Sequence, residues 1–187
     1  MGCFESTIIE DELAVSISPA DSGTISATGI ACPGDCTEIY TTGTAITLTA
    51  TETAGYQFDY WEQGGASFST NNIVTFSINA ASTFTITAVF VPVSTLNVSE
   101  SPADSGSISA TGITCPGDCS EILITDTDIV LTAAETTGFQ FDHWEEGGAP
   151  ISSLNPDTFT MSTDRTIVAV FVPVFTLDVS VSPADSG

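Results

Sequence analysis

The chain has 187 residues, with 24 Asp and Glu against one basic residue, Arg165, and a formal net charge of −23. A field of this sign repels phosphate backbones, so we expect no nucleic-acid partner, and the absence of lysine excludes isopeptide crosslinks and Schiff-base catalysis. No apolar run reaches 18 residues, so we expect no membrane span; the 42% hydrophobic content argues against disorder.

The N-terminus, "MGCFES", contains a cysteine that belongs to no pair, Cys3. The stretch matches an N-myristoylation pattern and is also similar to the acylation site of a bacterial lipoprotein. We therefore consider both a lipid anchor and an intermolecular disulfide at Cys3. We favour a third explanation over these two, in which the stretch is a start codon or the stub of a removed leader and has no function. No secretory leader is visible in this sequence.

The sequence repeats itself with a period near 80 residues. "SPADSG" stands at 18–23, 101–106 and 182–187, at spacings of 83 and 81 residues. We place the two-residue deletion in the loop 149–157. A period of this size suits a small domain with its own core. We predict an N-terminal tail at 1–12, β-repeat domains at 13–93 and 94–174, and the first strand of a third repeat at 175–187. No Gly/Ser-rich linker separates the repeats, so we expect a stiff joint.

Alternating apolar residues predict strands along both repeats. In "LAVSIS", Leu13, Val15 and Ile17 share one face, and "PADSG" supplies a turn into the next strand. "AITLTAT", "NIVTFSI" and "TFTITAVF" continue the pattern. The expected fold is all-β: tandem small β-sandwich or β-grasp-like domains, with at most one short helical turn near "FDYWEQGG".

Four cysteines fall in two copies of "CPGDC", as Cys32/Cys36 and Cys115/Cys119. Pro-Gly-Asp is turn chemistry that brings the flanking thiols together, so we favour a disulfide in each repeat. A zinc site is the alternative, although C-x3-C lacks the usual ligand spacing and no histidine accompanies it. Disulfides imply an oxidising compartment, and hence a secreted or cell-surface protein.

Calcium is the best small-ligand candidate, and no other cofactor is expected. The acidic loop residues that recur are Asp21, Asp104 and Asp185 in "PADSG" and Asp35 and Asp118 in "CPGDC". Asp also stabilises turns through its own side chain, and we favour this second interpretation. "NVS" at Asn97 is a lone N-glycosylation sequon.

No convergent catalytic set appears, so we predict that the chain is not an enzyme. The only histidine, His143, stands where the first repeat has Tyr60, and neither "HExxH" nor "GxSxG" occurs. Carboxylate pairs such as Glu145 and Glu146 exist, but an 80-residue module rarely forms a glycosidase cleft. The recurring Trp61 and Trp144 are interpreted as core anchors in preference to an exposed sugar-stacking platform.

A family resemblance rests on "GYQFDYWEQGG…TFSI…STFTITAVF" and its second copy, "GFQFDHWEEGG…TFTM…DRTIVAVF". Both resemble the divergent internalin-B B-repeat family, over about residues 13–174. The resemblance implies compact β-rich modules, related to a β-grasp-like unit, along secreted or surface-attached proteins, with no shared catalytic residues. The glycine usual before the tryptophan is Tyr60 or His143 here, so the local turn is expected to differ.

The functional prediction is a non-catalytic extracellular structural protein: a cell-surface stalk, spacer or fibre subunit. Residues 175–187 either begin a further repeat of a longer array or are a strand donated head-to-tail to a neighbouring subunit. The apolar residues of that strand are Phe175, Leu177, Val179 and Val181. The rival is an adhesion or binding module that recognises carbohydrate, calcium or a host protein through its loops.

Overall fold

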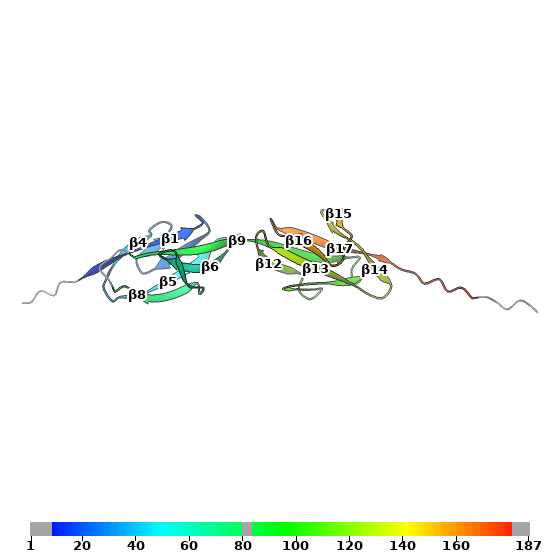
Figure 1. Ribbon diagram of the computed structural model, residues 1–187, viewed down its shortest axis with the longest axis horizontal. Coiled ribbons are helices and arrows are strands. Elements are labelled where there is room, and N and C mark those ends of the chain that lie inside the picture. The colour runs from blue at the N-terminus through cyan, green and yellow to red at the C-terminus, as the bar shows by residue number, and fades with distance from the viewer. Residues whose placement is uncertain (1–8, 80–83, 181–187) are drawn as a thin grey trace, which may run out of the picture. The chain divides into compact units, whose positions relative to one another are not determined.

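The computed structural model describes residues 9–79 and 84–180, in two compact units that divide between Val93 and Ser94 (Figure 1). Every regular element in these ranges is a β-strand, so the all-β prediction is confirmed. The described ranges accordingly hold no helix suited to crossing a membrane. The stretch "FDYWEQGG", for which the sequence allows at most a short helical turn, begins within the strand Tyr56–Gln63, whose alternate residues turn toward the core.

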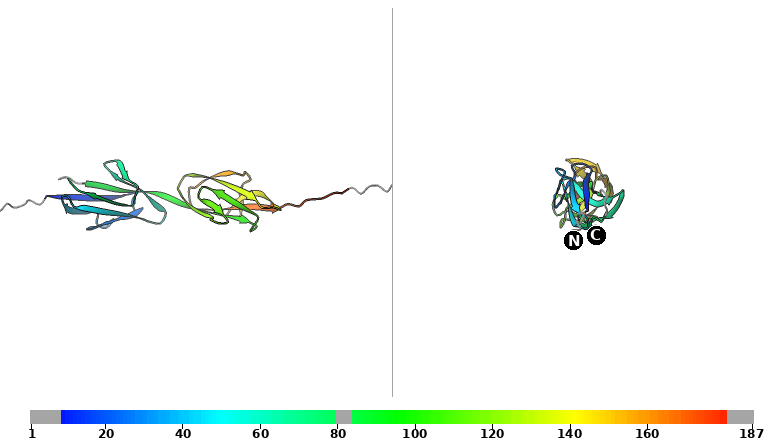
Figure 2. Two further views of the ribbon diagram at one scale, coloured as in Figure 1. Left: turned by 90° about the horizontal axis from the view of Figure 1, so that it is seen from below. Right: turned by 90° about the vertical axis from the view of Figure 1, so that its left-hand side faces the viewer.

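The first unit is built from two facing sheets (Figures 1 and 2). One sheet has the order β7-β6-β9-β1-β4 and the other the order β3-β2-β5-β8. The pairing of β1 with β9 is parallel, and the other pairings of this unit are antiparallel. The strands are β1 (Glu10–Ser18), β2 (Gly23–Ala27), β3 (Ile30–Cys32), β4 (Thr37–Thr41), β5 (Ala45–Glu52), β6 (Tyr56–Gln63), β7 (Ala66–Ser69), β8 (Ile73–Ser77) and β9 (Phe84–Ser101).

The second unit repeats this topology, with the later part of β9 as its first strand. Leu96–Ser101 of β9 pairs in parallel with β17, and β12 also pairs with β9. The other sheet has the order β11-β10-β13-β16. The strands are β10 (Gly106–Ala110), β11 (Ile113–Cys115), β12 (Ser120–Ile124), β13 (Asp128–Glu135), β14 (Phe139–Glu146), β15 (Ala149–Ser152), β16 (Asp157–Thr160) and β17 (Arg165–Pro173).

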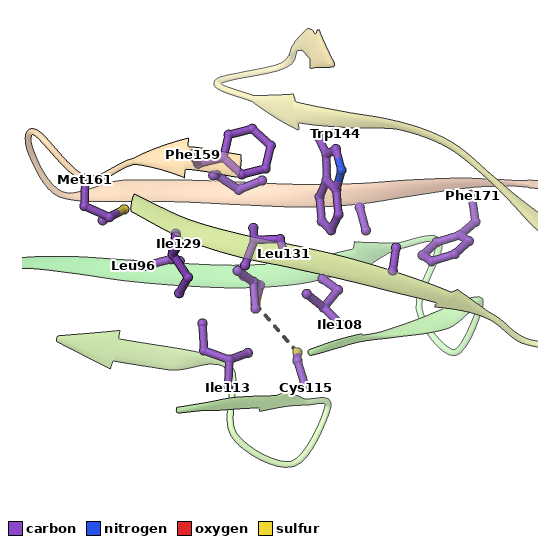
Figure 3. Close-up of a cluster of buried hydrophobic side chains, with 14 residues drawn as sticks. Leu96, Ile108, Ile113, Cys115, Ile129, Leu131, Trp144, Phe159, Met161 and Phe171 are labelled. Atoms are coloured by element: carbon purple, nitrogen blue, oxygen red, sulfur yellow. Dashed lines mark hydrogen bonds between the residues drawn. The ribbon is translucent and has the colours of Figure 1, made fainter. Parts of the chain in front are cut away.

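Each unit closes its own apolar core between its two sheets. The core follows from the period-2 alternation, which sends every second side chain inward. Trp144 is fully buried, and its indole N–H donates to the carbonyl oxygen of Leu154 at 2.9 Å. The ring of Phe141 lies 5.2 Å from that of Trp144, and Leu131 and Ile108 line the same interior (Figure 3). Trp61 is equally buried in the first unit, so the interpretation as core anchors is confirmed.

The strand register corrects the position of the two-residue deletion. Phe76 pairs with Ile46 and Phe159 with Ile129, so the spacing of 83 persists through Phe159. The deletion therefore falls in the connection that leads into the last strand of the repeat, not in the loop 149–157. That loop keeps its length because it supplies the carbonyl that accepts the buried Trp144 N–H.

Candidate functional site

The "SPADSG" turn owes its composition to backbone and packing requirements. Asp21 has a φ of 64°, in the left-handed region that Asp tolerates better than most residues. Ser22 is fully buried, and its hydroxyl donates to the Pro19 carbonyl at 2.6 Å. A Cβ on Gly23 would lie 2.3 Å from the ring of Phe90, so only glycine fits. The second repeat has the same arrangement at Pro102, Asp104, Ser105, Gly106 and Phe171.

The calcium candidates do not gather into one cluster. Asp21, Asp104, Asp35 and Asp118 are exposed side chains in separate turns, and Asp185 lies outside the described residues. Across residues 9–79 and 84–180, no three His, Cys, Asp or Glu side chains come together as a metal site. The left-handed φ gives the turn interpretation a physical basis for Asp21 and Asp104. Calcium binding stays a prediction.

The "CPGDC" loop is closed by a disulfide and tied to the first strand of its domain. Cys32 and Cys36 are bonded, with Cα atoms 4.6 Å apart. The amide of Asp35 donates to the carbonyl of Ala31, and the amide of Ala31 donates back to Asp35, each at 2.9 Å. The Cys36 carbonyl accepts the amide of Val15 at 2.8 Å. Cys115–Cys119 forms the same bridge, with Val98 donating to Cys119. The predicted cysteine pairing is thus confirmed, while Cys3 lies outside the described residues.

The first strand of each domain is the central element of this region. It lies between the last strand, in parallel, and the strand that follows the disulfide loop. Leu13 and Val15 are 0% and 5% exposed there, and their equivalents in the second domain, Leu96 and Val98, are 0% and 4% exposed. The core of each domain therefore depends on this strand.

The segment 174–180 carries the same alternation without a partner. Phe175, Leu177 and Val179 are 91%, 86% and 78% exposed, and no described residue pairs with this segment as a strand. Val181, the fourth apolar residue of the strand predicted for donation, lies outside the described residues. Three apolar side chains at alternate positions are therefore exposed together on a segment that the core of the second domain does not use.

At the start of the first strand a buried polar pair replaces the apolar pattern. Asp11 is 2% exposed, and one carboxylate oxygen accepts the Thr42 hydroxyl at 2.7 Å. The other oxygen is buried and has no partner among the described residues. The second domain has Ser94, 4% exposed, with its hydroxyl 3.0 Å from that of Thr125. Both domains thus hold a small polar side chain here, a feature that the sequence patterns did not reveal.

The single cation of the chain is engaged inside the second domain. Arg165 donates from Nη2 to Glu146 at 2.7 Å and from Nε at 3.1 Å, and its guanidinium lies 5.3 Å from the centre of the Phe159 ring. These hydrogen bonds hold the pKa of Glu146 below its usual value, although burial opposes them. The first domain has Phe84 and Gln63 at the equivalent positions. No pattern in the sequence indicated this ion pair.

The only histidine has carboxylate neighbours in an open setting. His143 Nδ1 lies 2.7 Å from an Asp142 oxygen, and Nε2 lies 3.9 Å from Glu145. Both carboxylates come from the same strand, β14, and no nucleophilic side chain in the described part of the chain is hydrogen-bonded to the ring. Tyr60 occupies the equivalent position in the first domain. The arrangement is that of a surface histidine beside acidic neighbours, not of a catalytic pair.

A hollow of about 260 Å³ opens beside β4 in the first domain. Tyr40, Thr28, Thr44 and Thr47 contribute to its wall. The Tyr40 hydroxyl donates to the carbonyl of Thr28. Burial, and then the charge of Glu38, raises the pKa of Tyr40. The phenol is therefore neutral at physiological pH and serves as a hydrogen-bond donor to the backbone.

Asn97, the asparagine of the glycosylation sequon, is exposed on β9, where it pairs with Thr166 of β17. Its side chain points away from the core, since the neighbours on either side, Leu96 and Val98, are buried. Glycosylation there stays a prediction.

Comparison with known proteins gives one family and several distant structural similarities. The family model described as "Divergent InlB B-repeat domain" matches residues 13–94 and 96–175. No curated protein matches the chain. The major pilin T-13 of Streptococcus pyogenes is 10% identical, covers 88% of this chain and 97% of its own, and has a TM-score of 0.30. The C-terminal fragment of the pilus adhesin SpaC from Lactobacillus rhamnosus GG is 11% identical, with coverage of 91% and 100% and a TM-score of 0.33. Such scores carry no functional argument.

The family match includes both repeats and most of the chain, and it agrees with the resemblance seen in the "GYQFDYWEQGG" and "GFQFDHWEEGG" stretches. The chain therefore belongs to the divergent InlB B-repeat domain family.

Proposed function

We propose that this chain is a non-catalytic structural part of a secreted or cell-surface protein, serving as a stalk, spacer or fibre subunit. The observation that carries the proposal is a contrast between the two repeats. Both repeats keep the positions that the fold uses internally: the buried tryptophan, the turn serine and glycine, and the cysteine pair. They do not share the side chains best suited to chemistry, the histidine and the arginine.

The histidine and the ion pair are not shared by the two repeats. Tyr60 is replaced by His143, and Gln63 by Glu146, whose partner Arg165 has no counterpart in the first repeat. Exposed polar side chains such as those of Glu52/Glu135 and Asp59/Asp142 do recur. A site built on the histidine or on the ion pair would therefore not be common to both modules, which supports a role that depends on the number of modules.

The disulfides support an extracellular location. Bridges such as Cys32–Cys36 persist in oxidising compartments and are rare in the reducing cytosol. The charge of −23 favours solubility outside the cell and disfavours close approach of like-charged surfaces.

An adhesion role is the second candidate, and one observation favours it. The outer side of β12 exposes Ile122 and Ile124, at 61% and 48%, where the first domain has Ile39 and Thr41. Two neighbouring exposed aliphatic side chains on one strand are suited to contact with a protein partner. Carbohydrate and calcium recognition through the loops belong to the same candidate role.

Two experiments separate these functions. Immunogold labelling of intact source cells with antibodies against the chain is expected to decorate the cell surface or extracellular fibres; label confined to the cytoplasm would overturn the proposal. Glycan arrays and panels of extracellular proteins are then screened with the purified chain. Saturable micromolar binding that I122D/I124D abolishes would establish the adhesion role instead.

The fibre form of the proposal has its own test. Negative-stain imaging and sedimentation compare the full chain with a version that ends at residue 174. Concentration-dependent fibres that disappear on truncation support assembly through the segment 175–187. Fibres that persist reject strand donation, and a full-length chain that is monomeric at all concentrations rejects homotypic fibre formation.

A further inference from the structure

We infer that residues 175–180 form a docking strand whose partner is a further module of this same fold. The strand enters the first-strand position of that module, with Leu177 and Val179 facing its core. This inference rests on the proposed structural role and specifies how one module recognises the segment before it.

The sequence equivalence is residue by residue. "DELAVSIS" at 11–18, "STLNVSES" at 94–101 and "FTLDVSVS" at 175–182 align without a gap, each followed by "PADSG". Leu177 corresponds to Leu13 and Leu96, which are fully buried, and is itself 86% exposed. The same strand pattern is thus buried twice in this chain and exposed once.

The two complete domains show which contacts the docked strand would make. The first strand pairs in parallel with the last strand of its domain, and β1 pairs antiparallel with β4. The Val15 amide donates to the carbonyl of Cys36, and the Val98 amide to that of Cys119. In the partner module the Val179 amide would donate to the carbonyl oxygen of the second cysteine in that module's "CPGDC"-type loop. Main-chain pairing supplies affinity and the alternate side chains supply register, as in other strand additions.

The first-strand positions of this chain are not the receptor. They are filled by β1 and by β9, which are part of the same chain and therefore act at high effective concentration against any incoming strand. Phe175 also aligns with Asp11 and Ser94, two small buried side chains that contact Thr42 and Thr125 hydroxyls. An aromatic ring would overpack that space. The partner module must have room for a phenyl ring where these domains have a polar pair.

The first experiment adds a module to the intact chain. Gly187 is followed directly by a second copy of residues 107–174, which continues the repeat without a break. Phe175 is replaced by serine in this extended chain, because the added copy keeps a threonine equivalent to Thr125 at the position that a phenyl ring would overpack. We expect the amides of 176–180, unprotected in the original chain, to exchange at least about a hundredfold more slowly in the extended chain. Leu177→Asp should remove that protection together with the fold of the added module. Ser180→Asp, at the position equivalent to the exposed Ser99, is the matched control and should leave both intact.

Two results of this experiment would overturn the inference. One is a folded added module with 176–180 still unprotected. The other is an added module that folds only when Asp178 is also replaced by asparagine, which restores "STLNVS", the second domain's own strand.

A second experiment places the strand in an existing domain and decides the matter if the added module does not fold. The substitutions E12T/A14D/I17V change residues 12–18 of β1 to "TLDVSVS", the sequence that follows Phe175. Domain 1 should keep its hydrogen-exchange protection, and adding Leu13→Asp should abolish it. Loss of protection in the triple variant would contradict the inference.

The identity of the partner is tested by Asp11→Phe alone, which should lower the melting temperature of domain 1. A raised melting temperature would show that the existing position accepts the ring, and exchange between copies of this chain would then be the better explanation. None of these readouts depends on cell-surface location or on ligand binding, so a failure here is distinguishable from failure of the proposed function.

Discussion

Replacing Gly106 by alanine should destabilise the second domain by steric overlap with its two nearest neighbours. An alanine Cβ at this position would lie 2.3 Å from Cζ of Phe171 and 2.6 Å from the carbonyl oxygen of Ala134. Gly106 does not have a positive φ, so the alanine backbone itself is unstrained. Any loss of stability therefore reports the close packing of this glycine against the Phe171 ring and the Ala134 carbonyl.

The expected loss is about 2 kcal/mol, because inserting a methyl group into a packed core usually costs about 1–3 kcal/mol. For a domain of this size each kcal/mol changes the melting temperature by about 4–8 °C, so the second domain should melt roughly 8–16 °C lower. The first domain should be unaffected, since its own glycine, Gly23, packs against Phe90.

Denaturant titration followed by hydrogen exchange and mass spectrometry measures the stability of each domain separately. Phe171→Leu removes the outer ring atoms and should reduce the effect of Gly106→Ala, which a double-mutant cycle quantifies. Gly106→Ala with a melting temperature within about 2 °C of the parent would refute the packing argument. So would a cycle with no coupling between the two positions.

Three further predictions address the bridges, the ion pair and the calcium question. C32S/C36S should lower the stability of domain 1 by about 2 kcal/mol, the loop-closure entropy of so short a ring, as measured by denaturant unfolding against the domain 2 signal. The lowered pKa of Glu146 means that its contribution to stability is present above the unfolded value near 4.5 and is lost as pH falls through the folded value. Thermal melts at pH 7 and pH 3 should therefore show a larger loss for the parent than for E146Q, and equal losses would exclude this role for the Arg165 pair. Calcium should raise the melting temperature no more than magnesium does at equal ionic strength. A specific site, with calcium at a hundredfold its Kd, would instead add about 2.7 kcal/mol to the free energy of unfolding. D21N should diminish that gain if the Asp21 turn is the site.

Features that depend on near neighbours in the chain were predictable. The period-2 alternation in "LAVSIS" needs only the pleat of a strand to predict which side chains enter the core, and Leu13 and Val15 do so. The bridge between Cys32 and Cys36 needs only a turn of three residues to bring the thiols together. The recurrence of such motifs was enough to identify both repeats; the assignment of residues 175–180 to a further repeat stays a prediction.

Other features needed the tertiary structure, because they join residues that are far apart in sequence. Many strands here have similar alternation, so nothing local shows that β1 pairs in parallel with β9 across some seventy residues. The burial of Asp11 against Thr42 is invisible for the same reason, since an acidic residue next to Glu10 and Glu12 resembles a solvated strand end.

The sequence by itself therefore determined the class of fold, the inward faces of its most regular strands and the cysteine pairing, all of which follow from local stereochemistry and periodicity. The tertiary structure alone decided which strands are neighbours, why Gly106 must lack a side chain beside Phe171, and where Arg165 finds its carboxylate partner. These depend on which distant surfaces pack most closely, and that competition is settled only when the two sheets close over a common core.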